Sequence, residues 1–141
     1  MGIQYGTSYS STDDSKLAPG TKVDAGVRRF HNDFSLATQG GGTQDTPLVA
    51  RIREGCAVCA FELSSSVDLS GLTFKLGIAT DDDKYAVAFA GPAAGKTVRA
   101  PIVPAMLAAG ALEQREDIIL TPSANMPAAG VVCTELFASK R

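Results

Sequence analysis

The chain has 141 residues, of which 45% are hydrophobic and 20% are charged, and its formal net charge is −2. This length and composition predict one globular domain and exclude a largely disordered chain. The small negative charge argues against nucleic acid as a partner, and no apolar run is long enough to predict a membrane span.

Residues 1–22 are a polar segment rich in Ser, Thr and Asp. Because such a segment cannot build a core of its own, we expect a flexible N-terminal arm that becomes ordered only against a neighbour. Tyr5 and Tyr9 are the amphipathic side chains that would anchor this arm. Residues 23–141 are then expected to form the folded domain.

The folded part begins with two segments in which apolar and polar residues alternate, as they do in half-buried strands. Gly26–Leu36 places its two phenylalanines on one face and Arg29, His31 and Asp33 on the other. After a glycine-rich loop, Leu48–Arg53 shows the same alternation. We expect a strand in each segment.

The middle of the chain predicts three further strands. Cys56–Leu63 is the first, and Thr73–Thr80 and Tyr85–Ala90 are expected to form a hairpin around the polar turn Asp81–Lys84. The residues that this hairpin should contribute to the core are Phe74, Leu76, Ile78, Val87 and Phe89.

Near the C-terminal end, Ala105–Arg115 is the one segment whose pattern predicts a helix, which Gly110 weakens by about 1 kcal/mol relative to Ala. Strands are expected again at Asp117–Thr121 and Val131–Ala138. About eight short strands with Gly- and Pro-rich connections predict an all-β fold, an antiparallel β-sandwich with one short helix.

Gly91–Thr97 (GPAAGKT) ends in the Gly-Lys-Thr of a phosphate-binding P-loop. It is one residue shorter than that motif, and no helix is expected after Lys96 whose N-terminus could hold a phosphate. We interpret the segment as a loop between strands and not as a nucleotide site.

Cys56 and Cys59 have the C-x-x-C spacing of zinc knuckles and redox pairs. The other possible ligands, Cys133 and His31, stand alone in the sequence, so the spacing does not support a zinc site. We expect Cys56 and Cys59 on opposite faces of a strand and no bound metal. The chain begins without a secretory signal, so reduced thiols in a protein made in the cytosol are expected.

Two other patterns could in principle carry chemistry. His31 is the single histidine and has Asp33 nearby, but no nucleophile motif accompanies it. Asp81–Asp83 could attract calcium, but the EF-hand pattern does not follow. The sequence therefore predicts neither a catalytic residue nor a cofactor, and we do not expect an enzyme.

Four arginines, Arg28, Arg29, Arg51 and Arg53, lie on two neighbouring predicted strands and could form a small basic patch on one sheet face. The patch carries too few charges for nucleic acid. It would suit a contact with an acidic protein surface.

Several short segments beyond residue 22 follow one another in an order that is similar to that of a known protein family. They are Gly26-Val27-Arg28-x-Phe30, Asp45-Thr46-Pro47, Leu69-Ser70-Gly71, Asp83-Lys84-Tyr85 and Met126-Pro127-Ala128-Ala129-Gly130. In this order the chain resembles the capsid cement proteins of tailed bacteriophages, which are also called decoration proteins. The resemblance implies the jellyroll form of the β-sandwich and no catalytic residues.

The same resemblance implies a structural virion protein, made in the host cytoplasm, that binds the outer surface of a bacteriophage capsid. Such a protein bridges neighbouring copies of the major capsid protein against the pressure of packaged DNA. A homo-dimer or homo-trimer at a capsid symmetry axis is then expected. The residues expected to touch the capsid are Tyr5, Tyr9, Arg28, Arg29, Arg51 and Arg53.

Two alternatives remain open. Jellyrolls also serve as lectins, so a carbohydrate- or receptor-binding module is the first, although the chain has no Trp and only 6% aromatic residues. A small nucleotide- or metal-dependent enzyme is the second, and the motifs above speak against it.

Overall fold

The computed structural model describes residues 26–39 and 41–140. The predicted N-terminal arm, with Tyr5 and Tyr9, lies outside the described residues. The described part forms β1 (Gly26–Ser35), β2 (Leu48–Ile52), β3 (Ala57–Ser65), β4 (Thr73–Ile78), β5 (Asp81–Ala90), β6 (Lys96–Arg99), α1 (Pro104–Ala108), β7 (Glu116–Pro122) and β8 (Val131–Lys140).

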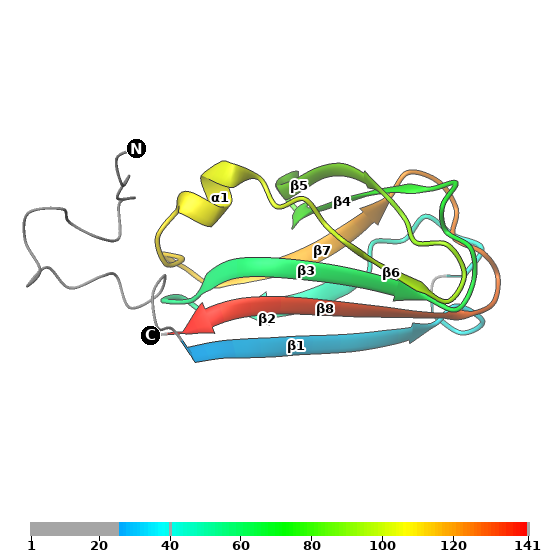
Figure 1. The fold of residues 1–141 in the computed structure, drawn as a ribbon, viewed down its shortest axis with the longest axis horizontal. Helices are drawn as coiled ribbons and strands as arrows, with labels where there is room; N and C mark the ends of the chain where they lie inside the picture. Colours follow the sequence, from blue (N-terminus) through cyan, green and yellow to red (C-terminus); the bar gives the residue numbers. More distant parts are fainter. Residues whose placement is uncertain (1–25, 40, 141) are drawn as a thin grey trace, which may run out of the picture.

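The eight strands form two four-stranded antiparallel sheets that pack as two layers (Figure 1). The first sheet has the order β1-β8-β3-β6 and the second has the order β2-β7-β4-β5. The first strand pairs with the last, the second with the seventh, the third with the sixth and the fourth with the fifth. A chain folded in half at the β4–β5 turn and then rolled up gives this order, which is that of a jellyroll. The predicted antiparallel jellyroll-like sandwich is confirmed.

The core lies between the two sheets and has an aromatic centre. Phe61 from the first sheet and Phe74 and Phe89 from the second are buried there. The ring centroids of Phe61 and Phe89 are 6.3 Å apart, and those of Phe74 and Phe89 are 6.1 Å apart. The side chains between the sheets therefore interlock across both layers.

The predicted hairpin of β4 and β5 is present, but its turn lies earlier in the sequence. Ile78 pairs with Asp81, so the turn consists of Ala79 and Thr80. The acidic run Asp81–Asp83 forms the first three residues of β5 and is not part of the turn.

Val87 was expected in the core, and this expectation is wrong because the register of β5 shifts. Phe74 pairs with Phe89, whereas Leu76 pairs with Ala86, so β5 carries one extra residue between the two pairs. A bulge of this kind reverses the alternation of side chains. Val87 is consequently 57% exposed, while Phe89 remains buried.

The predicted helix is also largely absent, since α1 has only five residues. The chain turns to extended backbone at Ala109. Leu112 then donates its N–H to the carbonyl oxygen of Cys56 at 2.8 Å, and the N–H of Gly55 donates to Leu112 at 2.9 Å. These bonds use backbone groups that a longer helix would need. Within the described residues, no helix has the length and apolar character that a membrane crossing requires.

Candidate functional site

The described residues contain no group of three or more His, Cys, Asp or Glu side chains placed to hold a metal ion. Cys56, Cys59 and Cys133 are free thiols. The Sγ of Cys59 donates to the carbonyl oxygen of Phe137 at 3.1 Å, and burial raises the pKa of this thiol. A raised pKa keeps the thiol protonated, so Cys59 lacks the character of a nucleophile.

The segment Gly91–Thr97 connects β5 to β6, as the interpretation of a loop between strands requires. Gly95 has a φ of 70°, and its N–H donates to Ser65 at 2.8 Å. The N–H of Lys96 donates to Ala93 at 3.0 Å. Backbone N–H groups that a phosphate cradle would use are therefore already bonded within the protein, and a strand follows in place of a helix.

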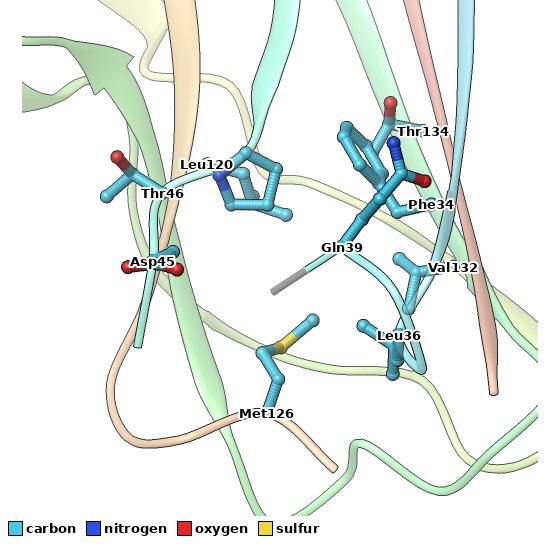
Figure 2. A pocket seen from close by; sticks show the side chains of 10 residues that line it. Phe34, Leu36, Gln39, Asp45, Thr46, Leu120, Met126, Val132 and Thr134 are labelled. Atoms are coloured by element: carbon cyan, nitrogen blue, oxygen red, sulfur yellow. The ribbon is translucent and has the colours of Figure 1, made fainter. Parts of the chain in front are cut away.

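An apolar cavity of about 200 Å³ opens between the two sheets, beside the loop that follows β1 (Figure 2). Phe34, Leu120 and Met126 are among the side chains that line it. Among the polar residues that line it, Gln39 accepts a hydrogen bond from the N–H of Ser35. Asp45 and Thr134, which also line the cavity, are likewise hydrogen-bonded within the protein, to Thr43 and Asn32.

A row of charged side chains crosses the outer face of the first sheet. These residues are register partners on successive strands: His31 of β1 lies opposite Glu135 of β8, and Glu135 lies opposite Glu62 of β3. Glu62 in turn lies opposite Arg99 of β6. Arg29 reaches diagonally to the same carboxylate: its guanidinium donates to both oxygens of Glu135, with Nε 2.9 Å from Oε2. This face is therefore polar, and the ion pair between Arg29 and Glu135 links β1 to β8 across it.

Glu135 is the centre of this row. The hydrogen bond from Arg29 is the main cause that lowers the pKa of the Glu135 carboxyl, and a hydrogen bond with His31 adds to the effect. His31 itself lies between two carboxylates, 3.1 Å from Glu135 and 3.9 Å from Asp33. These contacts assign His31 to the salt-bridge row and not to a catalytic pair.

The structure separates the four arginines that were expected to share one sheet face, so that expectation is wrong. Arg28 and Arg29 lie on β1 in the first sheet, whereas Arg51 lies on β2 in the second. Arg29 binds Glu135, and the Nε of Arg51 is 3.7 Å from Asp117. The jellyroll connection sends successive strands to opposite layers. The predicted alternation also fails at the start of β2, where a register shift leaves both Val49 and Ala50 buried.

Arg28 and Arg53, by contrast, line one hollow of about 650 Å³ at the end of the sandwich where β1 begins. We call this the arginine hollow. Its other lining residues are Glu54, Gly55, Cys56, Ala111, Leu112 and Glu113. No carboxylate in the described part of the chain lies within ion-pair distance of either guanidinium. Arg28 and Arg53 are thus the two arginines of the predicted set that are available to a partner.

One polar cluster was not anticipated from the sequence. The hydroxyl of Tyr85 donates to one oxygen of Glu116, and the Nζ of Lys84 binds the other. Burial is the main cause that raises the pKa of Tyr85, and the bond to Glu116 adds to it. Tyr85 and Glu116 are 31 residues apart on different strands, so no local motif could have joined them. The cluster ties the middle of β5 to the first residue of β7.

No family model matches the sequence, and no curated protein matches it. Solved structures do resemble the fold. A chain of the cyanophage Pam1 capsid asymmetric unit superposes with a TM-score of 0.59 at 18% identity, covering 96% of this chain and 100% of that one. A chain of the capsid of Ralstonia phage GP4 gives a TM-score of 0.57 at 15% identity, covering 93% of each chain.

A third structure shows the same fold at lower identity. A chain of the acidic stable capsid structure of Helicobacter pylori bacteriophage KHP30 gives a TM-score of 0.55 at 7% identity, with 80% of this chain and 86% of that chain covered. In all three cases the jellyroll accounts for most of both chains.

Proposed function

We propose that this chain is a structural protein of a bacteriophage virion. The observation that carries the proposal is the match with a chain of the Pam1 capsid asymmetric unit, which covers 96% of this chain and the whole of that one. A jellyroll of this size therefore occurs in a capsid as a chain of its own. By this analogy the whole of residues 23–141 would act as one capsid component.

Within the virion, we propose that the protein binds the outer surface of the capsid and cements neighbouring copies of the major capsid protein. Each bridge would add binding free energy that must be lost before the shell opens, which stabilises the closed state by mass action. The two packed sheets with their shared apolar core support a role as a rigid spacer. The described residues contain no metal cluster that would point to metal-dependent chemistry.

The arginine hollow is the best candidate for the contact with the capsid. Arg28 and Arg53 have no carboxylate partner in the described part of the protein, so both gain charge-assisted hydrogen bonds when they meet acidic groups on a partner. Arg29 and Arg51 must first release Glu135 and Asp117, so they would contribute less.

The arm of residues 1–22 would add contacts that form only on docking, with Tyr5 and Tyr9 as anchors. A homo-dimer or homo-trimer at a symmetry axis would present several hollows and arms at once. Carbohydrate binding has less support, since none of the large exposed hydrophobic residues of the described part is aromatic.

The test uses capsids from a phage strain in which the gene for this chain is deleted. Purified full-length protein should co-sediment with these capsids to a saturating, stoichiometric level and should raise the temperature at which they release DNA. Arg28→Glu and Arg53→Glu should weaken binding, while Arg51→Gln, two residues before Arg53 at an arginine already paired with Asp117, serves as the control.

Two results would contradict the proposal. If the full-length protein does not bind the capsids at all, the virion role fails. If it binds but electron cryo-microscopy finds it inside the shell, or finds that it bridges no capsid subunits, the cement role fails while the virion role stands.

A further inference from the structure

β1 is a long, regular strand at the edge of the first sheet (Figure 1). Its ten residues pair one to one with β8 without a register shift, and β8 is the one described strand with which it pairs. An edge of this kind offers a row of backbone N–H and C=O groups to another strand.

The other three edge strands of the described sandwich are poorer templates. β6 has four residues, β2 has five and includes a register shift, and β5 is interrupted by two register shifts. Short or bulged edges resist pairing with another chain. The regular geometry of β1 therefore singles it out.

The charges along β1 are arranged in a self-complementary order. Arg29, His31 and Asp33 follow one another on the outer face, with a cation and an anion at equal distances from the histidine. The guanidinium of Arg29 is bound to Glu135 but its side chain is 60% exposed, and the side chain of Asp33, 3.9 Å from His31, is 69% exposed, so each can meet a second opposite charge while it keeps its neighbour. A strand with this order can bind an antiparallel copy of itself.

We propose that β1 pairs with β1 of a second copy of this chain, antiparallel, about a two-fold axis at His31. In this register Arg29 lies opposite Asp33 of the second copy, and the same pair forms again on the other side of the axis. Opposite charges placed directly across antiparallel strands stabilise the pairing. The two first sheets then become one continuous eight-stranded sheet with an isologous interface.

Other registers lose this match. An axis at Phe30 sets Arg29 against His31. An axis at Asn32 sets His31 against Asp33 but Arg29 against Ser35, so in neither register does the arginine face an opposite charge. An axis between two residues would place outer side chains opposite inner ones, which the alternation of a sheet does not allow. The axis at His31 also pairs the strand over residues 27–35, nearly its full length.

The proposal rests on the strand itself and does not depend on a role in a capsid. It is tested with the full-length chain in solution, in a background where Cys59→Ser and Cys133→Ser remove the partly buried thiols. The second change is needed because Cys133 lies opposite Asp33 within one chain, so Asp33→Cys could otherwise form a disulfide with it.

The first measurement is disulfide mapping under mild oxidation. Only the residue on a two-fold axis meets its own copy, at a spacing that a disulfide can bridge. His31→Cys should therefore cross-link into dimers. Arg29→Cys and Asp33→Cys, about 13 Å from their own copies, should each form no disulfide cross-link when alone. A mixture of these two variants should cross-link, because positions 29 and 33 face each other.

The second measurement is sedimentation equilibrium of the unmodified chain. We expect a concentration-dependent dimer whose dissociation constant rises roughly tenfold or more for Asp33→Arg, because two attractive pairs become repulsive. Circular dichroism should show that the variant remains folded.

A chain that stays monomeric, a trimer, or a dimer that Asp33→Arg leaves unchanged would each overturn the proposal. Cross-linking of Asp33→Cys alone, without cross-linking of His31→Cys, would do the same, because it would place the axis elsewhere.

Discussion

Glu135 accepts hydrogen bonds from Arg29 although the two residues are not register partners. Arg29 pairs with Phe137 and Glu135 pairs with His31, so the guanidinium crosses the β1–β8 pair diagonally to reach the carboxylate. One carboxylate thereby serves two neighbours on β1 at once. This arrangement ties the stability of the first sheet to the charge of Glu135.

We expect part of the stability to be lost in acid through Glu135. Its pKa is lowered in the folded state, so its contribution is present above the pKa of the unfolded chain, about 4.3, and is lost as the pH falls through the lower folded value. Urea unfolding between pH 6 and pH 2.5 measures this effect. Glu135→Gln should flatten the acid limb, and a variant that loses stability as steeply as the wild type would contradict the assignment.

The aromatic centre of the core makes a second, sharper prediction. Phe89→Ala should lower the free energy of unfolding by about 3–5 kcal/mol, since the ring is buried against Phe61 and Phe74. Val87→Ala, two residues away on the same strand, should change it by less than about 0.5 kcal/mol because Val87 is exposed. Equal losses at both positions would mean that the bulge in β5 is misplaced.

The loop after β5 should tolerate removal of its lysine. Lys96→Ala should change the free energy of unfolding by less than about 0.5 kcal/mol. ATP and Mg²⁺ should not shift the unfolding midpoint of this variant or of the wild type. Gly95→Ala provides the contrast: its positive φ should cost about 1–2 kcal/mol. Micromolar ATP binding that disappears in Lys96→Ala would restore the nucleotide interpretation.

The bond between Tyr85 and Glu116 predicts a loss of stability in alkali. Since the pKa of Tyr85 is raised in the folded state, its contribution is complete below about pH 10, the usual value for Tyr, and falls as the pH rises further. Tyr85→Phe should remove this dependence and cost about 1.5–3 kcal/mol, the range for a hydrogen bond to a charged group. Absorbance at high pH should show one tyrosine that ionises only on unfolding.

Deletion of residues 1–22 tests the proposed arm. These residues contain few large apolar side chains, so the deletion should barely change the unfolding midpoint of the free protein. The same deletion should weaken co-sedimentation with capsids if the arm supplies docking contacts. Equal occupancy of both proteins would leave the sandwich as the sole binding surface.

The sequence was informative where strands are regular and half-buried. Alternation alone located β1 and β8, since burial alternates along β8 and along β1 from Phe30 onward and no register shift interrupts their pairing. It failed at Val87 because a bulge depends on the partner strand. The helix was overestimated because the extended pairing of Leu112 with Cys56 is a long-range contact that local propensity does not contain.

The candidate contact residues were also only partly predictable from the sequence. The sequence identified Arg28 and Arg53 as arginines on adjacent strands, but the topology decided that these two share a hollow while Arg29 and Arg51 face opposite sides. Which guanidiniums find carboxylates depends on neighbours such as Glu135, 106 residues away from Arg29. No local pattern encodes that distance.

The position of β8 between β1 and β3 also sets the order in which the first sheet can assemble. During synthesis, β3 can pair with β6 as soon as β6 emerges, but β1 has no partner strand in the described sheet until β8 has left the ribosome, so β1 waits unpaired for most of translation. Closing a loop of about a hundred residues is entropically costly, and folds built on such distant contacts are slow to form. A chain interrupted before Val131 would leave β1 unpaired and one edge of β3 open, which makes incomplete synthesis the stage at which this protein is most prone to aggregate.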